Sequence, residues 1–315
     1  MAVLSMIAAG IAAGIAAGAA MSVAGPTPGV ASQDRSYDLH QAVAGHYSIT
    51  VDLGEPVRFR GYLEPVDRVP FIFDTATTHT AVAEPVAAQL GYQRDASRYR
   101  RADSMTGAFD TEYFTLSGFD FGAGSRAVNA IVLFDDQTRA FHAAGLMGAD
   151  AIGAGGYSLD LPAAQLRLTE GGPLRGDLRL SPERLMLGEA RVGGVSTPIK
   201  IMIDTGATAS LGNMALARAA RGGRSAQTTQ VEGVSSSETV VSYERKLVAG
   251  LEVGDLCMGW FYVSVADVHA FDVRGWADEP ALIIGLDVLR HARIDVDRET
   301  GLVDISGLTD HECER

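Results

Sequence analysis

The distribution of apolar and polar positions predicts short strands along most of the chain. Residues alternate between apolar and polar through Tyr47–Leu53, which is the period of a half-buried strand. Short, mainly apolar runs, typical of buried strands, lie at 71–73, 130–134, 199–203, 261–265 and 282–284. Two segments favour short helices: 84–91, with Pro85 in its first turn and Gly91 at its end, and 213–220. The pattern therefore predicts an all-β protein with a few short helices.

The predicted elements occur twice in the same order. Each half has an apolar strand that ends in aspartate, then a short helix, glycine-containing hairpins and an apolar-apolar-Gly-x-Asp element. That last element contains Gly148 and Asp150 in the first half, and Gly285 and Asp287 in the second. We interpret both of these aspartates as N-caps of short helices. The repeat predicts two β lobes, an N-terminal lobe over 47–172 and a C-terminal lobe over 173–308, followed by a tail over 309–315.

Each lobe places one aspartate at the end of its apolar strand. The C-terminal copy reads Ile201-Met202-Ile203-Asp204-Thr205-Gly206, and the N-terminal copy reads Phe71-Ile72-Phe73-Asp74-Thr75-Ala76. A small residue two positions after the aspartate lets its backbone N–H approach the carboxylate. Gly206 has no Cβ to interfere, whereas Ala76 would be strained at a positive φ. Two aspartates on two similar lobes suggest one shared site on a two-fold axis.

Together these motifs resemble those of the retropepsin-type aspartic proteases, the clan that includes retroviral proteases and, more distantly, pepsin. The resemblance covers about residues 45–308. It implies two pseudo-symmetric acid-protease lobes with the active site between them. It also implies that Asp74 and Asp204 form a catalytic dyad that shares one proton and activates a water. The expected function is an aspartic endopeptidase that hydrolyses extended protein segments.

The resemblance also assigns roles to the neighbours of the dyad. Thr75 and Thr205 are expected to cross to the opposite loop, with Ala76, Thr77 and Gly206 as further dyad support. A Thr77 hydroxyl bonded to Asp74 has no counterpart at Ala207, so we expect Asp74 to be the more ionised partner and Asp204 to carry the proton. This pattern also indicates activity nearer neutral pH than that of pepsin. The hairpins near Gly107 and Gly233 are expected to be flaps over a peptide cleft.

Composition and charge limit the classes of molecule that the protein is expected to bind. The 315 residues are 47% apolar and 21% charged, which suits a soluble globular protein with a substantial core. The net charge of −13 and the lack of a basic run exclude nucleic-acid binding. No zinc or phosphate-loop motif is present, so we expect no metal and no cofactor. The expected partner is a polypeptide substrate, and the expected state is a monomer with an internal pseudo-two-fold axis.

The N-terminal segment suggests export. Residues 1–24 carry no charged side chain and end in Ser22-Val23-Ala24, which predicts a cleaved signal peptide and a bacterial periplasmic location. An uncleaved anchor in the inner membrane is the alternative. Residues 25–46 are expected to form a flexible leader. In an exported protein Cys257 and Cys313 could pair, but we favour a buried, unpaired Cys257 and a free thiol on the tail.

We expect structural and not functional roles for three further side chains. Trp260 and Trp276 are expected in the core and Glu112 at the surface. The alternative function is a catalytically silent, protease-like peptide-binding module. Ala76 is the only feature that favours it.

Overall fold

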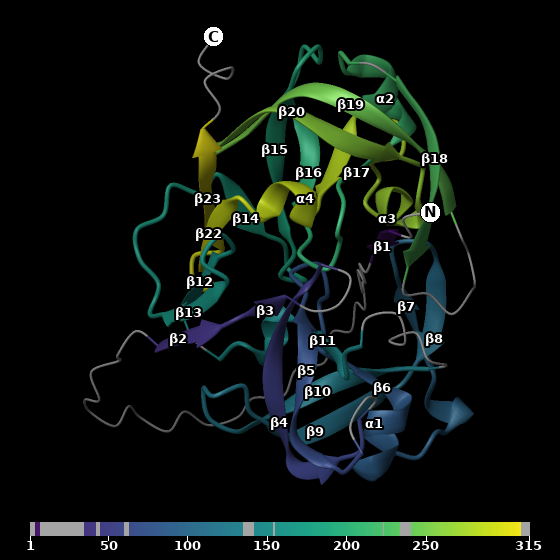
Figure 1. Cartoon of the computed structure of the whole chain (residues 1–315), viewed down its shortest axis with the longest axis vertical. Helices are drawn as coiled ribbons and strands as arrows, with labels where there is room; N and C mark the ends of the chain where they lie inside the picture. The colour runs from purple at the N-terminus through teal and green to yellow at the C-terminus, as the bar shows by residue number, and fades with distance from the viewer. Residues whose placement is uncertain are drawn as a thin grey trace.

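Strands dominate both halves of the chain, as the alternating pattern predicts. The computed structural model describes residues 4–6, 35–41, 45–59, 63–134, 142–153, 155–222, 224–233 and 241–309. The protein is an all-β, two-lobed molecule, with the N-terminal lobe below and the C-terminal lobe above in Figure 1. The predicted fold class is confirmed.

The N-terminal lobe is built on a seven-stranded sheet in the order β3-β4-β5-β11-β6-β10-β9. Its elements are β3 (His40–Gln41), β4 (Tyr47–Val57), β5 (Val66–Phe73), β6 (Ala81–Ala83), α1 (Glu84–Gln89), a 3-10 turn (Ala96–Arg98), β7 (Arg100–Asp103), β8 (Ala108–Thr111), β9 (Tyr113–Phe119), β10 (Arg126–Leu133), β11 (Gly145–Met147) and a second 3-10 turn (Ala149–Ala151). Strands β7 and β8 form a separate hairpin. The predicted helix over 84–91 is present as α1.

The C-terminal lobe repeats this arrangement. Its elements are β14 (Leu178–Leu180), β15 (Met186–Val192), β16 (Ile199–Ile203), β17 (Leu211–Gly212), α2 (Met214–Ala219), β18 (Arg224–Gly233), β19 (Val241–Val253), β20 (Asp255–Val265), α3 (His269–Asp272), β21 (Ala281–Ile284), α4 (Leu286–Leu289), β22 (Ala292–Asp297) and β23 (Leu302–Thr309). Strand β1 (Leu4–Met6) pairs with β18. The predicted helix over 213–220 is α2.

The two aspartate strands have the same neighbours in both lobes. Strand β5 runs parallel to β11, and β16 runs parallel to β21. In each pair the second strand leads into the Gly-x-Asp element, where the backbones cross closely. A Cβ on Gly148 would lie 2.9 Å from Thr77 Cγ2, and one on Gly285 would lie 2.6 Å from the carbonyl carbon of Ala209. Glycine is therefore needed at both positions because there is no room for a side chain.

A shared sheet joins the lobes. Strands β12 (Gly156–Asp160) and β13 (Gln165–Thr169) belong to the first repeat, yet β12 pairs with β22 of the second along its whole length. Strand β2 (Arg35–Asp38) extends this sheet by pairing with β13. Tyr157 of β12 is buried and packs edge-on against Phe73, the residue before Asp74. This sheet fixes the lobes relative to each other across the dyad.

Several expectations differ from the structure. Within the predicted leader over 25–46, residues 35–41 contribute β2 and β3 and bury Leu39, so this part is not a flexible segment. Cys257 is disulfide-bonded, so the preference for an unpaired Cys257 is wrong. Cys313, the only other cysteine of the sequence, lies outside the described residues. The signal-peptide expectation falls mostly outside them too. In the part that is described, no helix has the length and apolar character needed to span a membrane.

Two predicted burial states are also wrong. Trp260 on β20 has 52% of its surface exposed, although we expected a core residue. Glu112 is only 1% exposed, although we expected a surface residue. Its carboxylate accepts hydrogen bonds from the Tyr92 hydroxyl at 2.6 Å and the Asp95 N–H at 2.7 Å, and pairs with Arg98 at 3.0 Å. These partners replace the water that a surface carboxylate would bind.

Candidate active site

The two predicted aspartates lie at matching positions where the lobes meet. Asp74 follows β5, and Asp204 follows β16, and neither has any exposed surface. The Asp74 N–H donates to the Met147 carbonyl at 3.0 Å, and the Asp204 N–H donates to the Ile284 carbonyl at 3.0 Å. The Gly-x-Asp strand of each lobe therefore holds the aspartate backbone in place.

Each carboxylate is oriented by the residue two positions later. The Ala76 N–H donates to Asp74 Oδ1 at 2.8 Å, and the Gly206 N–H donates to Asp204 Oδ1 at 2.9 Å. Within the described chain, positive φ angles at non-glycine residues occur only at His142, Ala164 and Arg184. Ala76 is therefore unstrained, and it orients its aspartate as Gly206 does.

The two threonines cross between the lobes. The Thr75 hydroxyl donates to the Ile203 carbonyl at 3.2 Å and accepts from the Thr205 N–H at 3.1 Å. The Thr205 hydroxyl donates to the Phe73 carbonyl at 2.8 Å and accepts from the Thr75 N–H at 3.0 Å. Both side chains are buried, so these four bonds are shielded from water. They tie the two aspartate loops into one unit.

A second pair of aspartates supports the loops from behind. Asp150 Oδ1 accepts from the Thr80 N–H and hydroxyl, each at 2.8 Å. Asp287 Oδ1 accepts from the Ser210 N–H at 2.9 Å and its hydroxyl at 2.7 Å. The predicted N-cap roles are wrong, because the N-caps are the preceding glycines and the aspartates lie in the first turn. Thr80 lies six residues after Asp74, and Ser210 lies six residues after Asp204. An alignment of the two copies would therefore have revealed that Thr80 and Ser210 are equivalent.

The two central carboxyls differ in their ionisation. Burial raises the pKa of Asp74 to about 7, against the backbone N–H groups of Ala76 and Thr77, which lower it. Burial raises the pKa of Asp204 well above its ordinary value, and the negative charge of Asp74 raises it further. With Asp204 protonated, its proton can bond to Asp74, and this interaction lowers the pKa of Asp74. The pair therefore holds one proton near neutral pH, mainly on Asp204.

The hydrogen bond that the sequence suggested as the cause of this difference in pKa is absent. The Thr77 hydroxyl donates to the His79 carbonyl at 3.0 Å, so the expected bond to Asp74 is not formed. Two other residues approach the Asp204 side. The His46 Nε2 lies 3.1 Å from the Gly206 carbonyl, and burial lowers the pKa of His46 to about 4. The positive charge of Arg274 lowers the pKa of Asp204, so it opposes the larger raising effects of burial and of Asp74. Nothing in the local sequence pattern marks His46 or Arg274.

The two flap candidates belong to hairpins of different length. Gly107 lies in the turn of β7–β8, where its carbonyl accepts from the Ser104 N–H at 2.8 Å. Gly233 is the last residue of β18, which pairs with β19. The connection between β18 and β19 over 234–240 lies outside the described residues.

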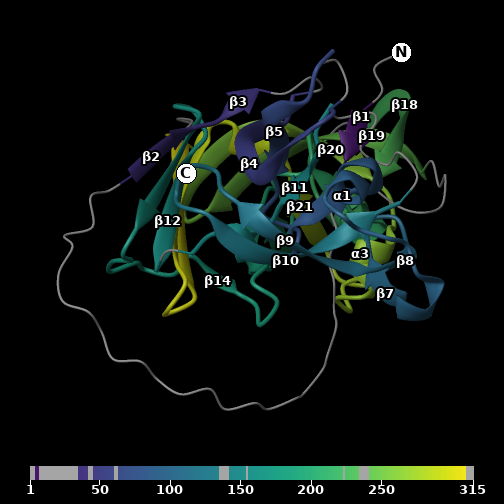
Figure 2. The ribbon, with the colours of Figure 1, turned by 90° about the horizontal axis from the view of Figure 1, so that it is seen from below.

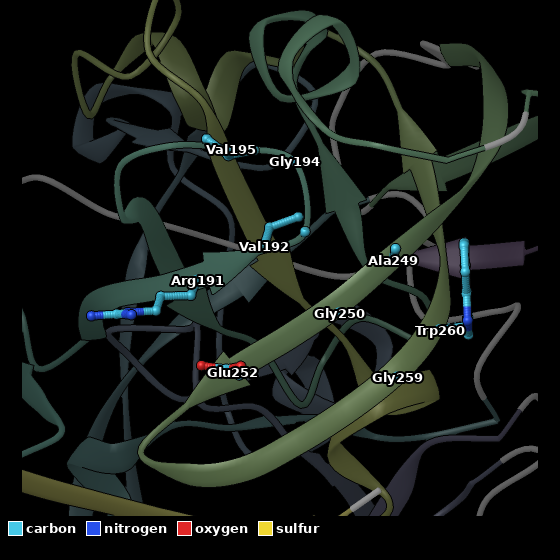
Figure 3. A pocket seen from close by; sticks show the side chains of 10 residues that line it. Arg191, Val192, Gly194, Val195, Ala249, Gly250, Glu252, Gly259 and Trp260 are labelled. Atoms are coloured by element: carbon cyan, nitrogen blue, oxygen red, sulfur yellow. The ribbon is translucent and has the colours of Figure 1, made fainter. Parts of the chain in front are cut away.

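A surface pocket of about 390 Å³ lies elsewhere on the C-terminal lobe. It is lined by residues of β15, β19, β20 and the turn after β15, and Figure 3 shows Arg191, Glu252 and Trp260 around it. None of its lining residues is a predicted site residue. Among the described residues there is no group of three or more His, Cys, Asp or Glu side chains placed to hold a metal ion.

Comparison with known families agrees with this architecture. The family described as aspartyl protease matches residues 56–151 and matches again at 188–288. Together these segments cover more than half of the chain. The chain therefore belongs to the aspartyl protease family, in its retropepsin-like form, and it carries the family domain twice. No curated protein matches the chain.

Proposed function

We propose that this protein is an aspartic endopeptidase whose catalytic residues are Asp74 and Asp204. One observation carries the proposal: both carboxyls are buried, and each is held through Oδ1 by a matching backbone N–H. Apart from the proton that the pair shares, their buried Oδ2 atoms accept no hydrogen bond from the described part of the protein. A buried carboxylate oxygen without a partner is costly, and such sites are expected where chemistry needs the group.

The mechanism follows from the ionisation of the pair. Ionised Asp74 takes a proton from the attacking water, and protonated Asp204 donates a hydrogen bond to the scissile carbonyl oxygen. The water oxygen bonds to the carbonyl carbon, and the resulting intermediate breaks its C–N bond as the nitrogen gains a proton. The threonine bonds keep both carboxyls in place during these steps. Because the pKa of Asp74 is about 7, we expect activity to fall as the pH drops below neutrality.

The test compares wild type with Asp74→Asn and Asp204→Asn on a peptide library from pH 3 to pH 9. We expect cleavage by wild type, sensitivity to pepstatin, and loss of at least about 100-fold in both variants, since each supplies one half of the acid–base step. Thr300→Ala, on an exposed turn, serves as a control that keeps activity. Cleavage that survives in one Asn variant would refute the shared dyad. No cleavage by wild type, with peptide binding retained, would favour the silent binding module.

The proposal includes the setting of the enzyme. The substrate is a polypeptide in extended conformation, bound by one monomer whose two lobes supply one aspartate each. Export to an oxidising compartment such as the bacterial periplasm is supported by the uncharged segment 1–24 and by the disulfide at Cys257. Fractionation of cells that express the full chain, with mass determination of the product, separates cleavage after Ala24 from retention as an anchor.

A further inference from the structure

The β7–β8 hairpin of the N-terminal lobe reaches across to the C-terminal lobe. Figures 1 and 2 both show the hairpin beside α3. Its turn is held by the Ser104 hydroxyl, which donates to the Gly107 carbonyl at 2.6 Å. Beyond this turn, the Ala270 N–H of α3 donates to the Met105 carbonyl at 3.2 Å. The tip of the hairpin is therefore bonded to the opposite lobe.

Met105 at this tip is completely buried. It belongs to a hydrophobic cluster of residues from the C-terminal lobe, among them Met202, Val268 and Phe271. The same cluster contains Ala76 and Ala207, which follow the two central aspartates. Met105 therefore belongs to the same apolar cluster as the residues that follow the two aspartates.

A polar contact secures the same docking. His269 Nε2 lies 2.7 Å from Asp103 Oδ1, and both side chains are partly exposed, at 29% and 23%. Asp103 ends β7 and His269 begins α3. The His269–Asp103 contact therefore lies at the solvent-exposed side of the interface between the hairpin and the C-terminal lobe, and Met105 lies at its buried side. Partly exposed ion pairs contribute little free energy, so the buried methionine is the main element of the docking.

We propose that Met105 occupies the subsite of the C-terminal lobe that receives a substrate side chain, so that substrate binds by displacing it. The inference rests on the proposed function, because it places the subsite beside the catalytic pair. The displaced group also indicates what the subsite accepts. The space that the Met105 side chain fills, in a cluster with Phe271, Val268 and Met202, would take a flexible or γ-branched apolar side chain, such as methionine or leucine. It excludes lysine and glutamate, whose charges would be buried without partners.

The test measures peptide binding without cleavage, in the Asp204→Asn background. The ligands are peptides that differ at one position next to the scissile bond. This position carries Met, Leu, Val, Lys or Glu. We expect Met and Leu peptides to bind at least about tenfold more tightly than Lys and Glu peptides. Met105→Ala should tighten the binding of Met and Leu peptides about tenfold, because the competing side chain is gone. Met214→Ala, at a methionine that is 41% exposed, should change nothing.

A second variant covers the case in which Met105→Ala disturbs folding. His269→Ala loosens the docking from the exposed side and leaves the cavity intact, and it should tighten binding by about threefold. Unchanged or weaker binding in Met105→Ala and in His269→Ala would overturn the inference, as would equal binding of Met and Lys peptides. If the wild type does not cleave peptides, the proposed function is refuted but this inference is not, because the binding measurement needs no catalysis.

Discussion

The Asp74 loop and the Asp204 loop have the same internal bonds and different surroundings. Each carboxylate accepts from the N–H two residues later, and each threonine donates across the interface. The differences lie outside the repeat: His46 contacts the carbonyl of Gly206, and Arg274 acts on Asp204. The duplication therefore preserves the geometry of the pair, and contacts from non-equivalent segments distinguish its two members. Four predictions test whether the two loops share their geometry and differ only in their surroundings.

The largest expected effect is a gain in stability on removing either carboxyl. A carboxyl with a raised folded-state pKa binds protons more tightly in the folded than in the unfolded state, so stability falls as the pH rises above its ordinary value of 3.8. We expect Asp74→Asn to raise the free energy of unfolding by roughly 4 kcal/mol at pH 8 and by less than half as much at pH 5. Asp204→Asn should change it in the same direction, because burial also raises the pKa of Asp204. Urea unfolding at both pH values measures this.

The control for this prediction is Asp67→Asn, at an exposed aspartate of β5, which should leave stability unchanged. A gain in only one of the two Asn variants would show that the ionisation cost belongs to one site and not to the pair. A loss of stability at pH 8 would show that the carboxyls are paired with groups that compensate their burial.

The threonine bonds give the next largest effect, and it should be symmetric. Thr75→Val leaves the Thr205 N–H without its acceptor and the Ile203 carbonyl without its donor. Thr205→Val does the same to the Thr75 N–H and the Phe73 carbonyl. Each substitution should cost roughly 3 kcal/mol in unfolding free energy, because two buried groups lose a partner. Calorimetric or denaturant unfolding of both variants provides the comparison.

Serine substitutions at the same two positions keep the hydroxyls and serve as matched controls. They should retain most of the stability and the activity. If one valine variant costs several times more than the other, the two crossings are not equivalent. The pseudo-two-fold axis would then describe the backbone but not the energetics.

The features that could be predicted from the sequence are those encoded twice. Both aspartate strands and both Gly-x-Asp elements can be predicted because each copy supports the interpretation of the other. The crossing role of Thr75 and Thr205 follows from the resemblance to the retropepsin-type proteases. The segments that occur once were missed. The proline, glycine and serine content of 25–46 predicts a leader there, whereas β2 is stabilised by its pairing with β13, a distant segment of the chain. Trp260 was placed in the core because composition cannot tell which face of a strand meets solvent.

The same limit applies to the site. His46 lies at the end of the expected leader, and Arg274 lies beyond α3, far in sequence from the aspartates. Their contacts with the C-terminal loop depend on tertiary packing, which no spacing rule encodes. The predicted bond from the Thr77 hydroxyl to Asp74 was wrong because the hydroxyl donates to the His79 carbonyl instead.

His46 provides a third test, through the acid side of the stability curve. Its folded-state pKa of about 4 lies below the ordinary 6.5, so the unfolded state gains a proton first as the pH falls. Wild type should therefore lose roughly 2 kcal/mol between pH 7 and pH 4.5 from this group. His46→Gln keeps a donor for the Gly206 carbonyl and does not titrate. We expect its unfolding free energy to exceed that of wild type at pH 4.5 by about this amount, relative to their difference at pH 7.

His40→Gln is the matched control, at an exposed histidine of β3 whose removal should leave the pH dependence unchanged. If His46→Gln and wild type show parallel curves, His46 is not held neutral by burial. The difference in ionisation between Asp74 and Asp204 would then rest on the burial of the pair and on the charge of Asp74.

The smallest effect is expected at the one position where the two loop motifs differ in backbone freedom. Ala76 has no positive φ, and its N–H is as close to its carboxylate as that of Gly206. Ala76→Gly should therefore leave kcat/KM within about threefold of wild type, and it should cost about 1 kcal/mol of stability through the added freedom of the unfolded chain and the lost buried methyl. Ala87→Gly, at a buried alanine of α1 remote from the dyad, should cost a similar amount and leave activity unchanged. A rise of tenfold or more in kcat for Ala76→Gly alone would contradict this, because it would mean that the alanine restrains the N-terminal loop and that the two halves of the site differ in geometry as well as in surroundings.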